Sequence, residues 1–417
     1  MDPNPAEPAQ GAVEAGGRAS PAPSGKVWAA GGAPRRRLLY LVTEDWYFCS
    51  HRLPLAQAAL QRGFEVAVAT RVGRHEDTIR RAGIRVIPIG LRRSGLNPFK
   101  EATAAAELCR LYAAERPDIV HHVAAKPVLY GSLAARRARV PAVVNAMAGL
   151  GFAFISRGCK AAALKALLSR AYRWAMSGKN TMTIFQNEDD IKLFMDLGII
   201  EPGNARLIRG SGVDLDEFPA VPEPRVQPDK GPVVLLASRL LWDKGVGEFI
   251  DAARKLRASG VKARFVLAGD SDPDNPASIP REAIARWRDQ GLVDWRGWRD
   301  DMPETFAHCH VVCLPSYREG LPKVLLEAAA SSRPIVATDV PGCREIVRHE
   351  ENGLLVAPRD PGALAAALSR LIRNHEERER FGRRGREIAQ AQFSVERVIE
   401  QTLDLYEELL RLAGRPA

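Results

Sequence analysis

The chain has 417 residues, of which 46% are hydrophobic and 26% charged, and its formal net charge is +10. This length leaves room for two domains with separate cores, and the composition is that of a globular protein, not a fibrous or disordered one. The six cysteines lack the spacing of a disulfide scaffold, so a reducing cytoplasm is expected. No run of 18 apolar residues occurs, so no transmembrane helix is expected.

The N-terminal half alternates between short β-branched apolar runs and helical patterns. Residues 1–34 come first; they are rich in Pro, Ala and Gly, lack the apolar core of a signal peptide, and are expected to be a disordered tail. The expected strands that follow are 38–42, 64–70, 85–89, 118–122, 140–146, 181–186 and 205–208, and the expected helices are 53–62, 75–82, 98–115, 127–138 and 160–177. This alternation predicts a parallel sheet with helices on both faces.

The C-terminal half repeats the same alternation after a linker. Residues 214–232 are dense in proline and charge, which is typical of a connection between domains. The expected strands beyond it are 233–237, 263–268, 293–296, 310–314, 334–338 and 353–356, with helices between them and a helical end from 361 to 417. The charged run 376–387 is expected to face solvent. Two doubly wound, Rossmann-like domains would then face a central cleft, with the ligand at the carboxyl edges of the strands.

The basic excess is confined to one segment. Residues 119–187 contain no Asp or Glu, while the rest of the chain is balanced. The cations of this segment are Lys126, Arg136, Arg137, Arg139, Arg157, Lys160, Lys165, Arg170, Arg173 and Lys179. A solvated face is the simplest explanation of a charge run, but a stretch this long without acids favours an anionic partner. The helix expected near 160–176 also carries leucines and a tryptophan, which fits either core packing or the headgroup boundary of an anionic membrane.

The stretch 316-SYREGLPKVLLEAAASSRPIVATD-339 places Glu319 and Glu327 on either side of a Gly-Leu-Pro turn. A buried strand is expected before it and another after it, with a helix over 322–332 that has Pro322 at its first position. Free N–H groups at the start of such a helix attract phosphate. A carboxylate there is out of place unless it binds hydroxyl groups beside the phosphate.

Three further groups of polar residues follow strands of the second domain. Arg239 and Lys244 lie on one loop, where two cations can clamp a diphosphate. The turn 268-AGD-270 and the loop 297-GWRDD-301 come after the next two strands. Each group alone is a weak signal, because Gly and Asp are common in turns. In this order on one sheet, the groups are expected to converge.

Two patterns suggest metal sites, and both have a simpler explanation. The cluster 308-HCHVVC-313 overlaps an expected strand, in which alternate side chains point to opposite faces. The Asp-x-Asp triplets at 214/216, 270/272 and 272/274 lie in expected turns and the linker. No metal site and no cofactor are therefore expected.

Arg239, Lys244, the Glu319-x7-Glu327 pair and 341-PGCREIV-347 together resemble the retaining family 4 glycosyltransferases, which have the GT-B fold. The resemblance covers nearly all of residues 36–412. The stretches 45-DWYFCSHRLPLA-56 and 242-WDKGVGEF-249 look like those of bacterial enzymes that extend a sugar on undecaprenyl diphosphate. The family division implies an acceptor-binding domain over 35–221, a nucleotide-sugar-binding domain over 222–393, and a C-terminal helix over 394–417 that returns to the first domain.

The resemblance also implies roles for the residues of the second domain. Arg239, Lys244 and Glu319 would be catalytic: the two cations would neutralise the leaving diphosphate and Glu319 would contact the hydroxyls of the donor sugar. Glu327 would hold the ribose, although a helix residue that merely pairs with a nearby lysine remains the alternative. The remaining donor-binding residues implied are Gly320, Leu321, Pro322, Gly269, Trp298 and Arg299.

The first domain departs from the family pattern, because 43-TEDWYFCSHR-52 replaces the usual glycine-rich loop. The acceptor-binding residues expected there are Ser50, His51, Arg52, His122 and Lys126. The first three are expected at the N-terminus of the next helix, where they could meet the acceptor's diphosphate, and His51 could equally be a helix-cap neighbour. Of His121 and His122, one is expected in the core and one at the cleft. Residues 149–152 resemble the family at a later strand end.

The resemblance implies a metal-independent, retaining glycosyltransferase at the inner face of the cytoplasmic membrane. It would move a sugar from a UDP-sugar to a polyprenyl-diphosphate-linked saccharide and would not bind nucleic acid. Three alternatives stay open: a UDP-sugar 2-epimerase of the same fold, a non-catalytic basic module for membrane or nucleic acid, and a scaffold that has lost activity. The 2-epimerase would need acidic catalytic side chains in the first domain, which the acid-free segment disfavours.

Overall fold

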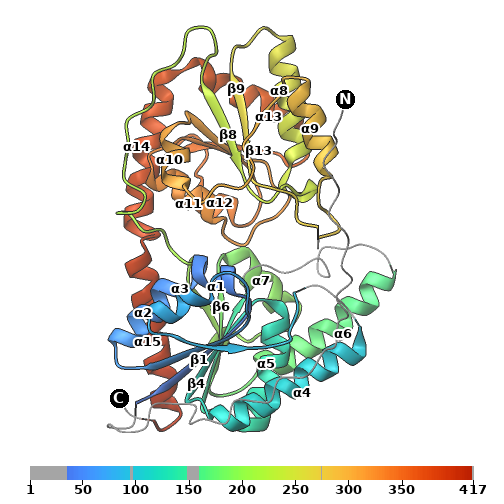
Figure 1. The fold of residues 1–417 in the computed structure, drawn as a ribbon, viewed down its shortest axis with the longest axis vertical. Coiled ribbons are helices and arrows are strands. Elements are labelled where there is room, and N and C mark those ends of the chain that lie inside the picture. Colours follow the sequence, from blue (N-terminus) through green and yellow to red (C-terminus); the bar gives the residue numbers. More distant parts are fainter. Residues whose placement is uncertain (1–34, 94–96, 148–158, 274, 416–417) are drawn as a thin grey trace, which may run out of the picture.

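The structure, a computed structural model, describes residues 35–93, 97–147, 159–273 and 275–415. Two α/β domains are stacked along the long axis of the molecule, with the N-terminal domain below and the C-terminal domain above in Figure 1. Each domain is built on one parallel sheet with helices on both faces. The expected α/β architecture of two doubly wound, Rossmann-like domains is confirmed.

The N-terminal domain contains a seven-stranded sheet in the order β3-β2-β1-β4-β5-β6-β7. Its strands are β1 (Arg37–Glu44), β2 (Glu65–Arg71), β3 (Arg85–Pro88), β4 (Ile119–Val123), β5 (Ala142–Met147), β6 (Thr181–Phe185) and β7 (Ala205–Leu207). Its helices are α1 (Asp45–His51), α2 (Leu53–Gln61), α3 (Glu76–Arg81), α4 (Pro98–Glu115), α5 (Ala125–Ala138), α6 (Cys159–Met176) and α7 (Glu188–Asp196). The central strands are buried along almost their whole length, as a sheet covered on both faces requires.

The C-terminal domain contains a six-stranded sheet in the order β10-β9-β8-β11-β12-β13. Its strands are β8 (Val233–Ala237), β9 (Arg264–Ala268), β10 (Asp294–Trp295), β11 (Val311–Leu314), β12 (Ile335–Thr338) and β13 (Gly353–Val356). Its helices are α8 (Val246–Ala258), α9 (Arg281–Asp289), α10 (Met302–Ala307), α11 (Lys323–Ala330), α12 (Cys343–Ile346), α13 (Pro361–Arg373) and α14 (His375–Gln392), with the short 3-10 helix η3 (Trp242–Lys244) after β8. The strand order reverses between β8 and β11, which is the point where open α/β sheets bind ligands.

The chain crosses between the domains twice, and the two crossings touch. The linker passes at Val213, whose N–H donates to the carbonyl of Phe393 (2.8 Å) and whose carbonyl accepts from Val395 (3.0 Å). Here α14 ends and α15 (Val395–Leu412) begins, so α14 lies along the upper domain and α15 along the lower one (Figure 1). The α15 residue Tyr406 is buried in the N-terminal core, with its hydroxyl 3.1 Å from that of Tyr40.

Several local features differ from the sequence-based expectation. The helix α1 follows β1 directly, where a loop was expected, and α11 begins at Lys323 with Pro322 as its N-cap. The charged run 376–387 is not simply a solvated face: in α14, Arg378 is buried and donates to both Glu223 oxygens (2.9 and 2.6 Å). A buried arginine that is fully paired is stable in such a place, whereas the residue type alone predicts exposure.

Candidate active site

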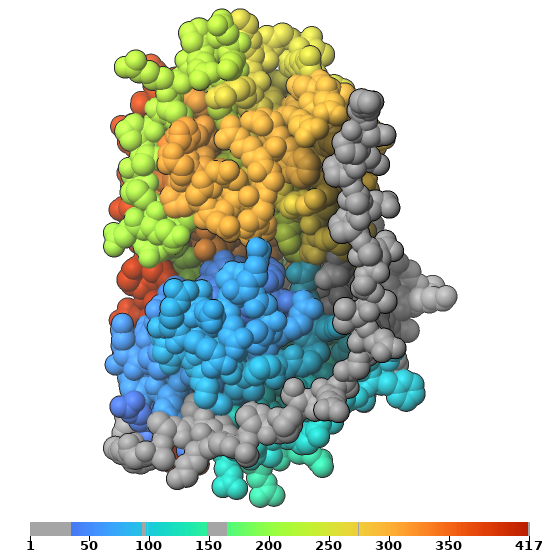
Figure 2. Space-filling view, viewed as in Figure 1, coloured from blue at the N-terminus to red at the C-terminus, as the bar shows by residue number. Residues whose placement is uncertain are grey.

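The carboxyl ends of the two sheets face each other, and polar contacts join the domains there. Arg93, after β3, pairs with Asp272, after β9 (2.9 Å). Asn187, after β6, donates to the carbonyl of Gly320, after β11 (2.8 Å). In Figure 2 the blue lower domain and the orange and yellow upper domain are in contact along this boundary. The loops that follow the strands of both sheets therefore build one shared region.

Lys244 and Glu319 form the centre of this region. The Nζ atom of Lys244 lies 2.6 Å from Oε1 of Glu319, and the Ser316 hydroxyl donates to the same oxygen at 2.6 Å. Gly245 makes this approach possible, because it has φ +72° and a Cβ atom there would lie 2.0 Å from the Pro315 carbonyl oxygen. The loop after β8 can therefore pack directly against the end of β11. The glutamate is thus fixed between a cation and a buried hydroxyl.

Arg239 is held by an acid shared with the other domain. Its Nη1 lies 2.8 Å from Oδ2 of Asp272, the atom that also accepts from Arg93. Burial tends to raise the pKa of Asp272, but hydrogen bonds to the two guanidinium groups outweigh this and lower it. Asp272 is therefore ionised at neutral pH and links the two arginines. From the sequence, Asp272 was expected to be a turn residue, and its contact with two arginines was not predicted.

The start of α11 offers unused backbone donors. The N–H groups of Gly320, Leu321 and Lys323 have no acceptor among the described residues. One turn further along, Glu327 is buried and its Oε1 lies 3.1 Å from Nζ of Lys323. Burial raises the pKa of Glu327, although the Lys323 ammonium opposes the shift. The ion pair with Lys323 agrees with the alternative that Glu327 is a helix residue that only pairs with a nearby lysine. Its burial, however, is unusual for a surface glutamate.

Three expected donor-binding residues lie on neighbouring loops of the C-terminal domain. Gly269 has φ +137°, and a Cβ atom there would be 1.8 Å from the Ser238 carbonyl oxygen, so no larger residue fits. Trp298 and Arg299 are exposed and bond to acids of their own loop, Trp298 to Asp300 (2.7 Å) and Arg299 to Asp301. Within the described parts of the chain, no contact joins these two side chains to Glu319. Their role stays a prediction.

The helix α1 brings the N-terminal domain over the same region. His51 ends this helix, and its ring stacks on that of Tyr47 at 4.1 Å. Burial lowers the pKa of His51 to about 3, with further lowering by Arg52 and by Lys323 of the other domain. Burial raises the pKa of Tyr47, and the charges of Arg52 and Arg239 oppose this. A neutral imidazole therefore lies at the boundary, near the start of α11.

Ser50, His51 and Arg52 lie where α1 ends and α2 begins, so their expected position at the start of a helix holds for Arg52 alone. Ser50 and His51 form the last turn of α1, whereas Arg52 is both the C-cap of α1 and the N-cap of α2. Ser50 is exposed. Arg52 is only 4% exposed; its Nη1 donates to the His51 carbonyl (3.2 Å), and its Nε has no partner within the described structure. A buried guanidinium without an acid is costly unless a ligand neutralises it.

The structure encloses both histidines of β4. His122 has no exposed surface, its Nδ1 lies 2.8 Å from Oδ1 of Asn145, and its ring fills the space beside Gly131. The expectation that His122 contacts an acceptor does not agree with this burial. His121 is also buried, with Nδ1 2.5 Å from the Tyr406 hydroxyl. Both are core residues, because alternate strand positions here face two covered sides of one sheet.

Lys126 is not a free cation. Its Nζ lies 2.7 Å from Oε1 of Glu101 in α4, so an acid from outside the segment 119–187 pairs with it. Residues 149–152 lie outside the described residues. The assignment of Lys126 to the acceptor therefore requires that an incoming phosphate compete with Glu101.

The histidine and cysteine cluster belongs to the core except for His308, which is exposed. His310, just before β11, accepts from the Val233 N–H at Nδ1 (2.9 Å), and Cys309 and Cys313 are buried. Among the described residues, no group of three or more His, Cys, Asp or Glu could hold a metal ion. In the same part of the chain, no helix is both long and apolar enough to cross a membrane.

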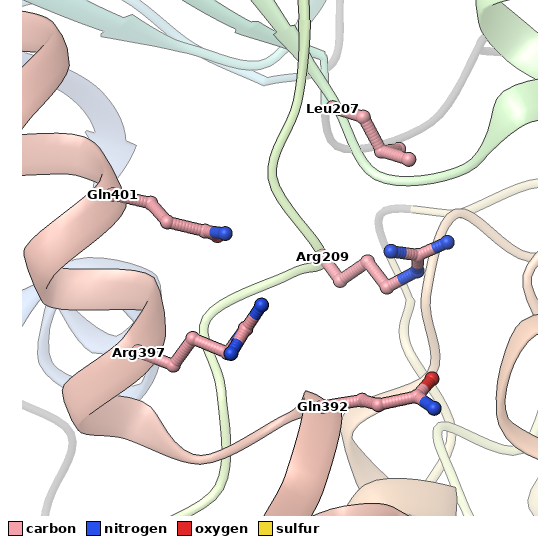
Figure 3. A pocket seen from close by; sticks show the side chains of 5 residues that line it. All are labelled: Leu207, Arg209, Gln392, Arg397 and Gln401. Atoms are coloured by element: carbon pink, nitrogen blue, oxygen red, sulfur yellow. The ribbon is translucent and has the colours of Figure 1, made fainter.

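A separate pocket of about 300 Å³ lies at the domain crossing and is lined by Leu207, Arg209, Gln392, Arg397 and Gln401. Gln401 and Arg397 extend from α15 toward the linker that carries Arg209 (Figure 3). None of the expected site residues lines this pocket. Arg209 is already paired with Glu345 (3.0 Å).

Sequence reasoning missed several polar residues of the boundary. Arg93, Asn187, Asp190 and Asp272 all follow strands, and each makes a contact across the domains. Asn187 begins 187-NEDD-190 at the start of a helix, a typical N-cap pattern, so its position could have been found. The partner of Arg93 could not, because that contact depends on how the two domains are placed.

Comparison with known proteins agrees with this geometry. The family "Glycosyl transferase 4-like" matches residues 37–187, and "Glycosyl transferases group 1" matches residues 231–374. The N,N'-diacetylbacillosaminyl-diphospho-undecaprenol alpha-1,3-N-acetylgalactosaminyltransferase of Campylobacter jejuni is 29% identical over 369 residues, which cover 86% of this chain and 95% of that protein. The UDP-Gal:alpha-D-GlcNAc-diphosphoundecaprenol alpha-1,3-galactosyltransferase of Escherichia coli is 28% identical over 286 residues, covering 66% of this chain and 71% of that protein.

Solved structures show the same fold. HepE of Anabaena, in complex with UDP and glucose, superposes with a TM-score of 0.71 at 18% identity, over 90% of this chain and all of that one. The sucrose-phosphate synthase of Thermosynechococcus elongatus gives a TM-score of 0.73 at 21% identity, again over 90% of this chain. The sheet topology, the paired cations and glutamates at the strand ends, and the two family matches lead to one assignment: the chain belongs to the family 4 glycosyltransferases and has their GT-B fold.

Proposed function

We propose that this glycosyltransferase moves a sugar from a UDP-sugar to a polyprenyl-diphosphate-linked saccharide, with retention of the anomeric configuration and without a metal ion. The observation that carries this proposal is the group formed by Lys244, Glu319 and the open N–H groups at the start of α11. It brings a cation, a carboxylate and backbone donors together at the carboxyl edge of one sheet. A sugar diphosphate needs all three, because it has both anionic oxygens and hydroxyl groups.

On the donor side, the leaving UDP carries negative charge that has to be stabilised. Arg239 and Lys244 would supply positive charge, and the N–H groups of Gly320 and Leu321 would donate to phosphate oxygens, with the helix dipole of α11 behind them. In the structure Arg239 pairs with Asp272 and Lys244 with Glu319, so these acids hold the cations in place. The assignment of the base to uracil follows the relative whose name contains UDP-Gal.

Glu319 and Glu327 would bind hydroxyl groups of the donor. Glu319 already accepts two hydrogen bonds at Oε1, and Oε2 is left for a sugar hydroxyl. Glu327 is buried with Lys323 as its partner and would accept from the ribose hydroxyls, which makes it a binding residue that does not touch the reacting atoms. Both roles use the carboxylate as a hydrogen-bond acceptor and not as a nucleophile.

The transfer itself would need little protein chemistry. The bond between the anomeric carbon and the UDP oxygen breaks as the acceptor hydroxyl oxygen forms its bond on the same face. The departing phosphate oxygen takes the proton of that hydroxyl, so no side chain has to act as the base. The protein contributes position and charge: Lys244 and Arg239 stabilise the oxygen that gains charge, and Glu319 orients the sugar.

On the acceptor side, Arg52 is the residue with the strongest structural argument. It is buried beside His51 at the domain boundary, without an acid partner in the described structure. The diphosphate of a lipid-linked saccharide would supply the missing negative charge. His51 is neutral and would contribute a hydrogen bond, not charge. The names of two relatives specify diphospho-undecaprenol substrates, which fits this arrangement.

An apolar and basic surface on α4, α5 and α6 would place the enzyme on the inner face of the cytoplasmic membrane. Four large apolar side chains are exposed on these helices: Phe99 (85%), Leu133 (39%), Leu167 (66%) and Trp174 (44%). Arg170, on the same helix as Leu167, is exposed and has no acidic partner among the described residues. The helix α5 packs against both neighbours, so the three helices form one side of the lower domain (Figure 1). Exposed apolar and basic groups together favour an anionic bilayer surface.

The test is thermal-shift screening of the purified chain against nucleotides and nucleotide sugars, followed by transfer assays with polyprenyl-diphosphate-linked saccharides. UDP and one or more UDP-sugars should raise the melting temperature, and at equal concentration the tighter ligand should raise it more. Product linkage, read by NMR, reports retention or inversion. If GDP raised the melting temperature in place of UDP, or if no nucleotide raised it, the proposed donor would be wrong. Transfer to a soluble sugar alone would overturn the proposed acceptor.

A further inference from the structure

We propose that Asn187 of the N-terminal domain is a positioning residue for the donor site, because it fixes the peptide between Gly320 and Leu321. The proposal rests on the proposed function, since it assumes that the loop after β11 binds the nucleotide sugar. It adds a requirement: the donor loop takes its shape only when α7 of the other domain is docked on it.

The Asn187 side chain is fully buried and hydrogen-bonds both to its own helix and to the donor loop. It is the N-cap of α7, and its Oδ1 accepts from the Asp190 N–H at 2.8 Å. Its Nδ2 donates to the Gly320 carbonyl at 2.8 Å and to Oδ2 of Asp190 at 3.1 Å. The carboxamide therefore uses its oxygen, and its amino group in part, for its own helix, and the same amino group donates across the domain boundary to Gly320.

Because a peptide unit is planar, this hydrogen bond fixes the orientation of the peptide between Gly320 and Leu321. The structure contains no cis peptide bonds among the described residues. In a trans peptide, the Gly320 carbonyl and the Leu321 N–H point in opposite directions. The pull of Asn187 on the carbonyl therefore directs the Leu321 N–H away from α7. That N–H is one of the open donors expected to meet the diphosphate.

Gly342 closes the other side of the same peptide. It has φ +83°, and a Cβ atom there would lie 2.5 Å from the Gly320 oxygen and 2.9 Å from the carbonyl carbon of Glu319. The Gly320 carbonyl is thus enclosed between Asn187 of one domain and the backbone of Gly342 of its own. A rotation of this peptide would have to break the hydrogen bond to Asn187 or press on Gly342.

Ion pairs on both sides hold the start of α7 against this loop. Arg318 pairs with the buried Asp190, and Arg344 pairs with Asp189 at 3.0 Å. Burial raises the pKa of Asp190, while Arg318 opposes the shift. These pairs fix where α7 lies, but none of them touches the Gly320 carbonyl. Within the described structure, the only side-chain hydrogen bond to that carbonyl comes from Asn187.

Two consequences follow for the site. Glu319 immediately precedes the enclosed peptide, and Lys244 and Ser316 hold its side chain, so its backbone and its carboxylate are both fixed. Donor binding and docking of α7 are then linked: whatever loosens the domain contact weakens the donor, and the donor strengthens the contact by the same factor.

The test compares Asn187→Ser with Asp189→Asn. Serine keeps the cap on α7 but is too short to reach Gly320, whereas Asp189→Asn removes an exposed interdomain ion pair and leaves the peptide contact intact. Asn187→Ser should weaken UDP binding about 3- to 30-fold by calorimetry and raise the donor KM similarly, with a melting temperature close to that of the wild type. Asp189→Asn should change UDP affinity less than about 2-fold.

Hydrogen–deuterium exchange of the ligand-free protein provides a readout that needs no donor. In Asn187→Ser, peptides covering residues 317–325 should exchange faster than in the wild type, while those from α13 stay unchanged. If a folded Asn187→Ser protein kept wild-type exchange in this loop and wild-type UDP affinity, the inference would be wrong. If the wild type bound no UDP, the proposed donor would fail, and the exchange result alone would then decide whether Asn187 orders the loop.

Discussion

Nζ of Lys244 lies 2.6 Å from Oε1 of Glu319, so an ion pair joins the loop after β8 to the loop after β11. Both side chains are largely buried, and the Ser316 hydroxyl binds the same oxygen. A charge held in this way does not have to be reorganised when a diphosphate leaves. The ion pair therefore holds the Lys244 ammonium in position before the reaction begins.

Lys244→Ala should lower turnover by roughly 100-fold or more, because it removes a preorganised charge at the leaving group. Arg239→Ala should have an effect of the same order for the same reason. Steady-state kinetics with the true donor measures both. Arg254→Ala, which removes an exposed arginine of α8, is the matched control and should leave turnover unchanged. A near wild-type rate in either test variant would show that the diphosphate is bound elsewhere.

Treatment with EDTA should leave the transfer rate nearly unchanged. The reason is that Arg239, Lys244 and the start of α11 would supply the positive charge that a magnesium ion supplies elsewhere. The measurement is the initial rate before and after chelation, and again after addition of Mg²⁺ or Mn²⁺. A rate that falls with EDTA and returns with metal contradicts the proposed mechanism.

Glu327→Ala should weaken UDP binding by about 1–3 kcal/mol, which corresponds to about 5- to 150-fold in Kd. The expected cause is loss of a charged acceptor for the ribose hydroxyls. Lys323→Met is the control, because it breaks the 3.1 Å ion pair and keeps the carboxylate. Equal losses in the two variants would assign the effect to the ion pair, and unchanged affinity in a folded Glu327→Ala protein would remove this residue from the site.

The protein should lose stability as the pH falls from about 6.5 to 4.5. Burial lowers the pKa of His51 to about 3 and those of His122 and His310 to about 4, whereas unfolded histidine titrates near 6.5. In this window the unfolded chain binds more protons than the folded one, so stability rises with pH, by about 1.4 kcal/mol per pH unit per histidine.

Melting temperatures across this pH range test the histidine prediction. His122→Asn, where the ring is fully buried, should show a shallower dependence than the wild type. His308→Gln, at an exposed position, is the control and should follow the wild-type curve. A melting temperature that stays level from pH 6.5 to 4.5 would mean that these histidines accept protons in the folded state.

The chain should sediment with anionic liposomes at low salt, bind neutral liposomes much more weakly, and be released as salt rises. Lys165→Gln with Arg170→Gln should reduce this binding strongly and leave UDP affinity unchanged; Arg157 and Lys160, expected to contribute as well, lie where side chains are not described. Lys255→Gln with Arg286→Gln, on the C-terminal domain, is the control of equal charge. Equal binding by the α6 variant would contradict the membrane proposal and favour a soluble acceptor.

Periodicity and turn residues were sufficient to predict most elements and the sheet class. The expected strand 233–237 coincides with β8, and the expected helix 98–115 coincides with α4. The helix α1 was not expected, because 45-DWYFCSH-51 is short and has the composition of a strand-end loop. The burial of His122 was not expected either, since the choice between a core and a cleft position depends on which helices cover that face of the sheet.

The candidate site was predictable in part. The pairing of Lys244 with Glu319 follows from two loops on neighbouring strands of one sheet, so the sequence pattern could bring them together. The contacts of Asn187 with Gly320 and of Arg93 with Asp272 depend on the relative placement of two domains, about which local patterns carry no information. Interdomain contacts are therefore where the structure adds most.

Because α15 packs on the N-terminal domain, the C-terminal domain can be completed before the N-terminal domain during synthesis. Tyr406, Leu409 and Leu410 belong to the core of the N-terminal domain, while the C-terminal domain is finished by α14. Tyr40 and Tyr406 are separated by 366 residues, which a ribosome takes roughly 20–70 seconds to make. The domain that leaves the ribosome first must wait with part of its core uncovered until α15 has been made.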